Sequence, residues 1–545
     1  MDTWKNQLFF GDNLEILRSG RIPVGSVDLI YLDPPFNSNA TYNILFAEKS
    51  GEKSAAQITA FEDTWQWGPE AAADFDDVVR GDRPRLAALL RAIREFLGQN
   101  AMMAYLARMA VRLVELHRVL KPTGSLYLHC DPTASHYIKL LLDAIFSPIN
   151  FRNEIVWKRT TAHNDPQRFG RIGDRIFFYT KSKHKVFNHV YGEYSTEQLS
   201  RYKYSNDRGS YRAENLTAPH FSATRTVEWR GVNPGKDRQW RFSIGELERL
   251  YQEGRILLQR DGRPRKDGLK VYLEEAKGTI LQDIWTDISF PPTTSERLSY
   301  PTQKPEALLK RIIKASSNEG DVVLDPFCGC GTTVSVAERL KRRWIGIDIT
   351  HLAITLVKKR LHDSFSPEEL APYEVIGEPA DAKSAAALAE VNRHQFEWWA
   401  LGLVDAAPAQ DKKKGADKGV DGVLYFQEKD DGPYHKLIVQ VKSGHVGAKE
   451  VRELEGTRRQ EKAEIAALLT LKPPTRPMKE AAPADYYVSA LFPDLSFPRL
   501  QILTIADLFA GKQLEYPRWV PPKTFKKAAR RRKGPTDQER QGELL

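Results

Sequence analysis

Cysteine is scarce in this sequence, because its 545 residues include only Cys130, Cys328 and Cys330. Three thiols form neither a disulfide framework nor the usual set of zinc ligands, so we expect a reducing, cytoplasmic environment. Long apolar runs are also missing, since no segment approaches the roughly 20 apolar residues of a membrane span. The first residues, MDTWKNQLFFGDN, lack the regions of a signal peptide. These absences predict a soluble protein without membrane association.

Two further absences narrow the chemistry. The sequence has no Gly-Lys-Ser/Thr loop of the Walker type, so nucleotide hydrolysis is not indicated. Neither sign of charge dominates, although 81 Lys and Arg against 71 Asp and Glu leave a formal charge of +10, which suits a polyanionic partner. The remaining composition is that of a globular protein, with 41% hydrophobic residues, and the length predicts two or three domains.

The first part of the chain has an α/β pattern. Residues 26–32, SVDLIYL, form a continuous apolar run, typical of a strand covered on both faces. Residues 84–120 have helical periodicity with a break near Gly98, and residues 125–131 predict the next strand. Strand, helix and strand in this order predict a parallel sheet. From about 160 to 294 the pattern loosens into a polar stretch rich in Arg, Lys and Tyr.

A nucleotide-binding unit is predicted further on, where DVVLDPFCGCGTTVSVAERLKRRWIGIDIT indicates strand, Gly-rich turn, helix and strand. Gly329 and Gly331 allow a tight turn and a close approach to a ligand. Asp348 ends the second strand about 23 residues after Asp325, near the spacing of an acid that binds ribose hydroxyls. An acidic Asp325 suits an ammonium group better than a pyrophosphate, so S-adenosylmethionine is favoured over NAD. A metal site at Cys328 and Cys330 is disfavoured, since two thiols are too few.

A second group of residues suits methyl transfer to an amino group. After the apolar strand come Asp33, Pro34, Pro35 and Phe36. The Asp33 carboxylate and the Pro34 carbonyl can accept the two hydrogens of an exocyclic amino group, because proline fixes the local φ. Phe36 can stack on an extruded base, and such stacking returns about 1 to 3 kcal/mol against an extrusion cost of a few.

These segments, in this order, resemble a DNA amino-methyltransferase of the β arrangement, in which the DPPF motif precedes the S-adenosylmethionine motif. Four further segments agree with the family: GDNLEIL from Gly11, FRNEIVWKR at 151–159, RIFFYTKS at 175–182 and SYPTQKPEALLKRIIKASSNEGD at 299–321. The resemblance spans about residues 5 to 365 and implies a Rossmann-like methyltransferase fold with a mixed, mostly parallel sheet. It places an inserted target-recognition region at 160–294, where basic and aromatic residues interleave.

The resemblance also implies roles for individual residues. Asp12 would contact the adenine of the cofactor, Thr302 and Lys304 would meet the methionine carboxylate, and Phe327 would complete the cofactor-binding set with the residues above. In this family an Asp at the position of Asp33 usually goes with adenine N6, whereas cytosine N4 enzymes more often carry Ser. Cytosine N4 is the alternative. One departure is the CGCG loop, in which a Cys stands where Ser is more usual between the glycines.

The C-terminal third poses a separate catalytic question. Residues 366–390 have the composition of an interdomain linker, and residues 391–520 form a second α/β pattern. Asp421 lies near the start of one strand, and period two places Gln440 and Lys442 on the same face of the next. An acid, a polar acceptor and a lysine can hold Mg²⁺ and position water against a phosphodiester.

This constellation resembles the Mrr-type restriction nuclease domain, a branch of the PD-(D/E)xK fold in which Gln replaces the second acid. The resemblance implies that Glu397, in the preceding FEWW helix, is a further metal-binding acid beside Asp421 and Gln440. Gln is a weaker metal ligand than a carboxylate, so a domain that only binds DNA is the alternative. Residues 521–545 predict a disordered basic tail.

The sequence thus predicts a restriction-modification polypeptide that acts on double-stranded DNA, with S-adenosylmethionine and Mg²⁺ as cofactors and a homodimer as one possible assembly. An RNA or protein methyltransferase is a rival, because Pro-Pro-aromatic sites also act on glutamine amides. The long recognition insert and the nuclease-like partner argue against that rival.

Overall fold

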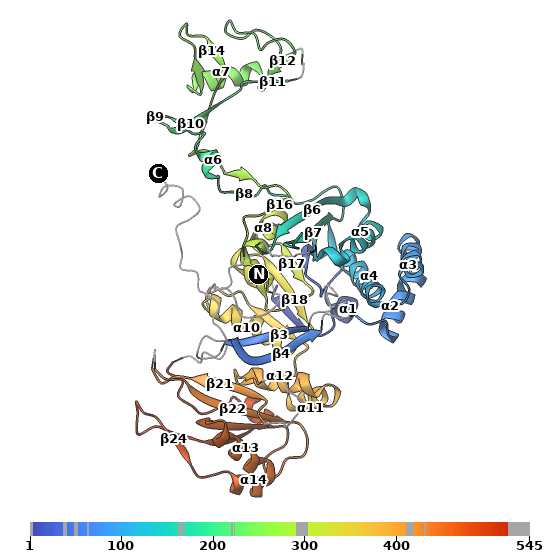
Figure 1. Ribbon diagram of the computed structural model, residues 1–545, viewed down its shortest axis with the longest axis vertical. Coiled ribbons are helices and arrows are strands. Elements are labelled where there is room, and N and C mark those ends of the chain that lie inside the picture. The colour runs from blue at the N-terminus through green and yellow to red at the C-terminus, as the bar shows by residue number, and fades with distance from the viewer. Residues whose placement is uncertain are drawn as a thin grey trace. The chain divides into compact units, whose positions relative to one another are not determined.

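The chain forms two compact units in the computed structural model, and Figure 1 labels many of its helices and strands. One contains the chain up to Asn188 and resumes at Asp283, and the other spans His189–Gln282. The structure describes residues 4–35, 65–161, 167, 169–219, 222, 224–289, 303–409, 419–429 and 432–520, together with the backbone of 41–47 and 53–62.

A nine-stranded sheet organises the methylase-like part, in the order β16-β6-β7-β5-β2-β17-β18-β1-β19. Its strands are β1 (Asn6–Phe10), β2 (Val27–Leu32), β5 (Leu120–Cys130), β6 (Phe151–Lys158), β7 (Gly173–Thr180), β16 (Ile284–Trp285), β17 (Val322–Asp325), β18 (Arg343–Asp348) and β19 (Tyr373–Ile376). Every neighbouring pair is parallel except the two pairs made by β7. The prediction of a mixed, mostly parallel sheet is confirmed.

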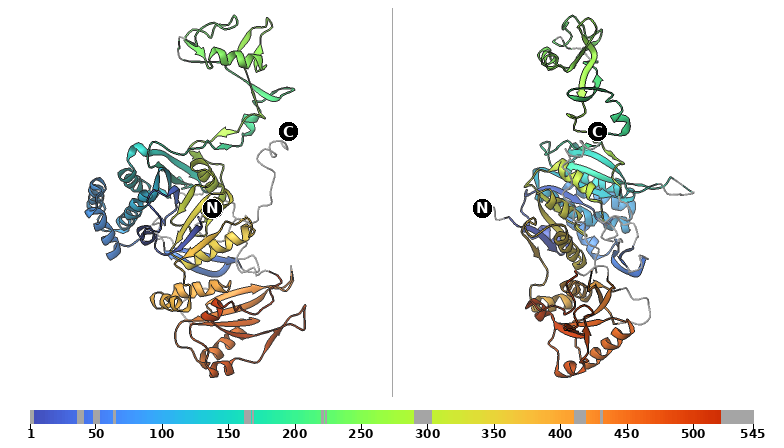
Figure 2. Two further views of the ribbon diagram at one scale, coloured as in Figure 1. Left: turned by 180° about the vertical axis from the view of Figure 1, so that it is seen from behind. Right: turned by 90° about the vertical axis from the view of Figure 1, so that its left-hand side faces the viewer.

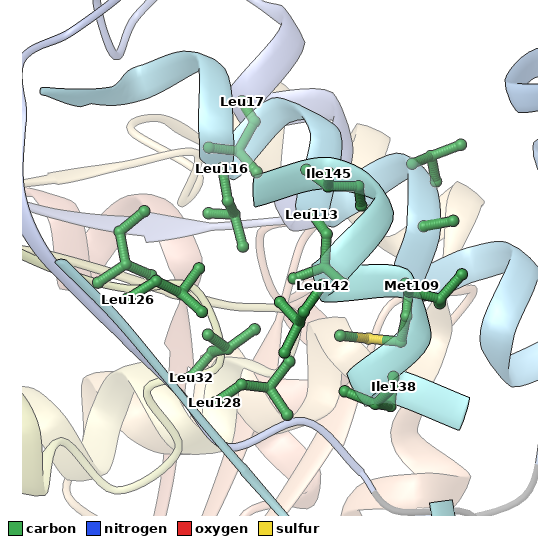
Figure 3. Packing of buried hydrophobic residues seen from close by; sticks show 14 of the residues in the cluster. Leu17, Leu32, Met109, Leu113, Leu116, Leu126, Leu128, Ile138, Leu142 and Ile145 are labelled. Atoms are coloured by element: carbon green, nitrogen blue, oxygen red, sulfur yellow. The ribbon is translucent and has the colours of Figure 1, made fainter. Parts of the chain in front are cut away.

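One face of this sheet is covered by helices from the N-terminal part of the chain. They are α1 (Asn13–Arg18), α2 (Pro69–Arg80), α3 (Pro84–Leu97), α4 (Ala101–Val119) and α5 (Pro132–Phe146). Figure 3 shows Leu126 and Leu128 of β5 packed against Leu113 of α4 and Leu142 of α5. The predicted helix break is confirmed, because Gly98 follows α3 with φ 70°.

The opposite face is covered by α8 (Glu306–Ser316), α9 (Thr332–Arg339) and α10 (His351–Ser364). Leu308 and Ile312 of α8 share a buried cluster with Tyr31 of β2, Tyr127 of β5 and Trp157 of β6. Burial on both faces explains why all six residues of β2 are apolar or inaccessible, as the continuous apolar run predicts. The sheet is therefore the middle layer of an α/β/α arrangement.

The pairing of β17 with β2 positions the site. Val323 and Leu324 pair with Leu29 and Ile30 in parallel register. From β17 the chain crosses through α9 to β18 on one side, whereas β5 lies beside β2 on the other. Ligands in open α/β sheets bind at such a switch point, outside the carboxyl ends of the strands. The loops that follow β2 and β17 are therefore neighbours.

The segment after the DPPF motif differs in part from expectation. The polar run NSNATYN, residues 37–43, predicts a mobile loop beside the pocket, but residues 41–43 begin β3 (Thr41–Ala47), which pairs antiparallel with β4 (Lys53–Glu62). The apolar and β-branched residues that follow, in ILFA and ITAF, favour a strand. Residues 36–40 lie outside the described part of the chain.

The segment predicted as a linker, 366–390, is also more ordered than its composition indicates. Residues 373–376 form β19, an edge strand that pairs in parallel with β1. Most of α11 (Ala382–Val391) lies in the same segment, and Ala385 on this helix is fully buried. The Ala-rich composition reflects helix propensity rather than chain flexibility.

The second unit, His189–Gln282, has its own core. A four-stranded sheet runs in the order β13-β14-β10-β9, and Trp229, Trp240 and Leu247 form the centre of a buried cluster beside it. The elements are β8 (Tyr191–Gly192), α6 (Thr196–Leu199), β9 (Tyr204–Asn206), β10 (Gly209–Glu214), β11 (Thr217–Pro219), β12 (Arg238–Trp240), α7 (Ile244–Gln252), β13 (Ile256–Leu258), β14 (Pro264–Tyr272) and β15 (Thr279–Ile280). This segment therefore folds into a small unit, although its sequence pattern is irregular.

The C-terminal part is a five-stranded sheet in the order β20-β21-β22-β23-β26. Its elements are α12 (Arg393–Leu403), β20 (Ala407–Pro408), β21 (Gly422–Phe426), β22 (His435–Lys442), α13 (Ala448–Gln460), β23 (Ile465–Thr470), α14 (Arg476–Ala481), β24 (Tyr486–Val488), β25 (Ser496–Pro498), β26 (Leu500–Thr504) and α15 (Ile505–Phe509). Two buried clusters lie on its two faces, one with α12 and the other with α13. The orange-to-red ribbon of Figure 2 shows this sheet with its helices from two directions.

No helix in the described ranges is both long enough and apolar enough to cross a lipid bilayer.

Candidate active sites

The loops at the carboxyl ends of β1, β17 and β18 contact one another. Asn13, just after β1, donates from Nδ2 to the Pro326 carbonyl in the loop after β17, at 2.8 Å. In that same loop the Gly329 amide donates to Oδ2 of Asp348 at the end of β18, at 3.0 Å. Carboxyl ends of parallel strands share one edge of a sheet, so the residues predicted from strand ends are brought to one place.

A buried arginine holds the loop after β1. Asp12 caps α1 by accepting from the Leu14 amide at 2.7 Å. Arg112 of α4, 3% exposed, donates to Oδ2 of Asp12 and to Oδ1 of Asn13, both at 2.7 Å. The sequence analysis identifies Asp12 but misses Asn13 and Arg112. Arg112 lies in the middle of a helix that sequence periodicity assigns to the core, so its position carries no local signal.

The Gly-rich turn requires its glycines. Gly329 has φ 50° and Gly331 has φ 74°, a left-handed conformation that L side chains rarely adopt. A Cβ at Gly331 would lie 2.8 Å from Cγ2 of Val357 on α10, so the turn is also tightly packed. Cys330, between them, is buried, and Arg360 Nη2 lies 3.6 Å from its sulfur.

Two buried acids border this turn. Asp325 is 3% exposed, and burial raises its pKa to about 7, although hydrogen bonds from Thr333 and from the Phe327 amide at 3.0 Å lower it. Burial also raises the pKa of Asp348, against hydrogen bonds from the amide and hydroxyl of Thr350, both at 2.9 Å. A nearby cation would stabilise the ionised form of either acid. The next side chain, Ile349, is 57% exposed.

Asp33, at the end of β2, has different neighbours on its two carboxylate oxygens. Oδ2 forms an ion pair with Lys304, and Oδ1 lies 3.9 Å from Nδ1 of His129. The sequence analysis assigns Lys304 to the methionine carboxylate of the cofactor, a role that stays a prediction beside this observed contact. Pro34 is buried, and the Pro35 carbonyl accepts from Nε1 of Trp65 at 3.4 Å. The predicted roles of Phe36 and Thr302 fall outside the described residues.

Behind Asp33 lies a polar network that the sequence analysis misses. His129 is the last residue but one of β5 and is fully buried. Its Nδ1 is 3.1 Å from the hydroxyl of Tyr31, and its Nε2 is 3.1 Å from Oδ2 of Asp174. Burial would raise the pKa of Asp174, but the hydrogen bond from His129 and the charges of His129, Arg159 and Lys304 outweigh it, so the pKa is lowered. In the sequence, this network is indicated by the polar His129 near the end of the apolar strand SLYLHCD.

In the C-terminal sheet, Asp421 and Gln440 lie on adjoining strands. The Asp421 amide donates to the Val439 carbonyl at 2.9 Å, and Oδ2 of Asp421 accepts from the Val441 amide at 2.7 Å. Gln440 is 7% exposed, and its Oε1 is buried without a hydrogen-bond partner in the described part of the chain. Lys442, two residues on, is partly exposed. Alternation along β22 places both side chains on one face.

Glu397 has its closest charged partners on its own helix. Arg393 Nε is 3.1 Å from its carboxylate, and His394 Nδ1 is 3.5 Å away. Phe396 of α12 packs with Val439, which alternates with Gln440 on β22 and so faces the opposite side of the sheet. Among the residues that the structure describes, no group of three or more His, Cys, Asp or Glu is placed to hold a metal ion. The predicted metal set therefore stays a prediction.

Comparison with known families gives two matches. The family described as DNA methylase matches residues 27–359, and the family described as restriction endonuclease, of the Mrr type, matches residues 388–489. Because the first match covers more than half of the chain, the chain belongs to the DNA methylase family. The resemblance of the C-terminal part to an Mrr-type nuclease domain is supported by the second match.

Individual relatives agree with these families. Type II methyltransferase M.EcaI of Enterobacter cloacae is 31% identical over 297 residues, which are 54% of this chain and 65% of that protein. DNA adenine methyltransferase YhdJ of Escherichia coli K12 is 56% identical over 75 residues, 13% of this chain and 26% of that protein. The crystal structure of the M1.HpyAVI–SAM complex covers 65% of this chain and 98% of its own, with 17% identity and a TM-score of 0.33. The chain spans between 49% and 65% of the length of the first three curated relatives.

Replacing Gly331 by alanine should damage the turn. Its φ of 74° and the 2.8 Å approach to Val357 predict a loss of about 1 to 3 kcal/mol in the free energy of unfolding, measured by urea denaturation. Gly320→Ala is the matched control, because Gly320 has φ 84° but no atom within 4 Å of an added Cβ. Equal losses in the two variants would contradict a role for packing against α10.

Asp325 should make stability depend on pH. Its pKa is about 7 in the folded protein against an ordinary 3.8, so the fold favours the protonated form. Stability from this group is therefore complete below pH 4 and is lost as the pH rises to about 7, by up to about 4 kcal/mol. Urea unfolding of Asp325→Asn should lack this decrease, whereas Asp207→Asn, an exposed control, should retain it. A decrease that persists in Asp325→Asn would refute the assignment.

Proposed function

We propose that this chain transfers a methyl group from S-adenosylmethionine to N6 of adenine in double-stranded DNA. The observation that carries the proposal is the parallel pairing of β2 with β17, which places Asp33 beside the Gly-rich turn and Asp325. Methyl transfer to nitrogen needs an acceptor that orients the amino group and a site that holds the methyl donor next to it. In this proposal the adjoining ends of β2 and β17 supply the acceptor and the site for the methyl donor.

The residues around the Gly-rich turn fit the proposed cofactor. A buried carboxylate whose pKa is raised to about 7 gains most from a cationic partner, and the α-ammonium group of S-adenosylmethionine is such a partner for Asp325. Asp348, with exposed Ile349 beside it, offers a carboxylate for ribose hydroxyls and an apolar surface for adenine. Asp12, Phe327 and the other residues assigned from the sequence complete the proposed set.

The reaction requires few chemical groups from the protein. S-adenosylmethionine supplies an electrophilic methyl group when bound. Asp33 and the carbonyl of Pro34 accept the two amino hydrogens of the target base, which turns the nitrogen lone pair away from the ring. Oδ1 of Asp33 is suited to this, because it is buried and has no hydrogen-bond partner in the described ranges. Phe36 would stack on the extruded base.

Adenine is proposed over cytosine for two reasons. The first catalytic position holds Asp33 rather than Ser, and the relative YhdJ, matched over 75 residues, is named a DNA adenine methyltransferase. Cytosine N4 methylation is the alternative within the same family. Sequencing of modified bases in the genome of a host that expresses the protein distinguishes the two and gives the recognition site.

The small unit is proposed to read DNA, within a recognition region of residues 160–294 in a methylase domain of residues 1–365. Its surface combines charge with a flat ring, since Tyr204 is 43% exposed and Lys203 lies 5.4 Å above it. Such a pair suits phosphate and base contact. A homodimer on double-stranded DNA stays part of the proposal.

The C-terminal part, residues 391–520, is proposed to be an Mg²⁺-dependent nuclease. Asp421, Gln440 and Lys442 come together on adjoining strands, and the buried Oε1 of Gln440 has no hydrogen-bond partner in the described ranges. A DNA-binding domain without cleavage is the second candidate, favoured by the position of Glu397 on the helix that packs on the other face. The basic segment 521–545 is proposed to bind phosphate nonspecifically.

Asp33→Ala should abolish methyl transfer while cofactor binding persists, because Asp33 orients the amino group and the Gly-rich turn binds the cofactor. Transfer of tritiated methyl groups to DNA measures the first, and calorimetric titration with S-adenosylmethionine measures the second. Arg91→Ala, on the exposed side of α3, is a control that should change neither. Loss of cofactor binding together with transfer would mean that Asp33 has a structural role.

Lys442→Ala should remove Mg²⁺-dependent cleavage without changing methylation, because the two sites belong to separate sheets. Cleavage is measured on plasmids with and without methylation, and Lys449→Ala on exposed α13 is the matched control. If the unmodified protein cuts neither plasmid at any Mg²⁺ concentration, the DNA-binding candidate replaces the nuclease.

A further inference from the structure

Three neighbouring strands of the large sheet contribute polar residues to one buried cluster around Asp33. Tyr31 belongs to the end of β2 and Asp33 directly follows it, whereas His129 lies near the end of β5 and Asp174 at the beginning of β7. Because β7 is antiparallel to β5, its beginning lies at the same edge as the ends of the parallel strands. Alternation along the strands puts all four side chains on the face that α8 covers.

The contacts define the protonation of His129. The pKa of Asp174 is lowered, so its carboxylate is ionised and can only accept, and Nε2 of His129 donates to it. Burial, with the charges of Asp33, Asp325 and Asp174, raises the pKa of Tyr31 well above its usual value, so the phenol keeps a proton for Nδ1. In the neutral ring Nδ1, which lies 3.9 Å from Oδ1 of Asp33, then accepts from the Tyr31 hydroxyl.

Methyl transfer to an amino group releases a proton. The bond from nitrogen to the methyl carbon forms, the bond from sulfur to that carbon breaks, and its electron pair stays on sulfur. The nitrogen is left with a positive charge and one hydrogen too many. Its proton must reach a base, and Asp33 is the group that the proposed function places against it. Asp33 must then lose that proton before the next turnover.

We propose that His129 receives this proton from Asp33, an inference that rests on the proposed methyl transfer. The Tyr31 hydroxyl turns away from Nδ1, and Oδ1 of Asp33 passes the proton to the lone pair that this frees. Asp33 returns to its carboxylate form, and His129 becomes an imidazolium. The positive charge lost from the sulfonium reappears on the ring, so charge is balanced. Asp174 stabilises the imidazolium through Nε2 at 3.1 Å, as carboxylates do for catalytic histidines. His129 is thus a positioning residue behind Asp33 that also relays a proton.

Other charged groups surround the relay. Arg159 lies 3.6 Å from Asp174, and Lys304 is paired with the other oxygen of Asp33. The ring of Trp157 on β6 meets His129 edge to face, with centroids 5.7 Å apart, and closes the remaining side. His129 is fully buried whereas the Asp33 side chain is 14% exposed, so the proton returns to solvent through Asp33 once the product leaves.

The test is the pH dependence of methyl transfer in a single turnover. Full-length wild-type, His129→Asn and Asp174→Asn proteins react with a duplex that carries the sequence methylated by the wild type. S-adenosylmethionine is kept saturating, so that titration of Asp325 does not affect the rate. Wild-type rates should fall at acid pH, because acid opposes the release of a proton into the relay. His129→Asn should react about 10²-fold more slowly and lose this acid limb.

Asp174→Asn should move the acid limb to lower pH, because the imidazolium loses its carboxylate partner. This variant tests the relay if His129→Asn does not fold. His117→Asn is the matched control, since burial lowers the pKa of His117 to about 4 and no relay passes through it. Cofactor binding should be equal in all four proteins.

Two results would overturn the relay alone: an unchanged rate and pH profile in His129→Asn, or an acid limb that Asp174→Asn leaves in place. A wild-type protein that methylates no DNA would overturn the proposed function and the relay together. If the wild type methylates DNA and neither variant changes the rate or the pH profile, the relay is wrong and the proposed methyl transfer stands.

Discussion

The parallel pairing of β17 with β2 is the constraint on which the site depends. Val323 and Leu324 are hydrogen-bonded beside Leu29 and Ile30, so Asp325 and Asp33 leave the sheet at the same edge. The two strands are about 290 residues apart in the chain, and the pairing must therefore overcome a large loop-closure entropy. Burial of apolar strands between two helical layers supplies the stabilisation, since both strands are buried throughout.

This edge of the sheet then concentrates negative charge. Asp33, Asp325, Asp348 and Asp174 all lie there, and each is wholly or largely removed from water. Neighbouring side chains compensate the negative charges of these acids unequally. Asp33 and Asp174 have the side chains of Lys304, His129 and Arg159 as neighbours, whereas Asp325 is bordered by hydrogen-bond donors. The acid with the weakest compensation is the one best suited to a cationic ligand.

Local patterns in the sequence predict most of the fold and the identity of several site residues. A buried strand that ends in Asp33-Pro34-Pro35, or a Gly-rich turn after Asp325, is recognisable because strand end and polar residue are adjacent in the chain. No local pattern encodes the ion pair of Lys304 with Asp33 or that of Arg112 with Asp12, because each pair joins segments that are distant in the chain. The order within the predicted linker escapes composition for another reason, because an edge strand of four residues and an Ala-rich helix resemble flexible chain in composition.

Each proposed site contains a buried polar atom without a hydrogen-bond partner among the described residues, and this shared feature bears on function. In the methylase-like sheet that atom is Oδ1 of Asp33, although Oδ2 is paired with Lys304 before any substrate binds. In the C-terminal sheet, Oε1 of Gln440 is buried without a hydrogen-bond partner among the described residues, at a cost of about 1 to 3 kcal/mol. An apolar residue would avoid that cost at a position 7% exposed. A ligand that contacts this amide oxygen beside Asp421, as the proposed metal ion or a water held against DNA would, removes that cost.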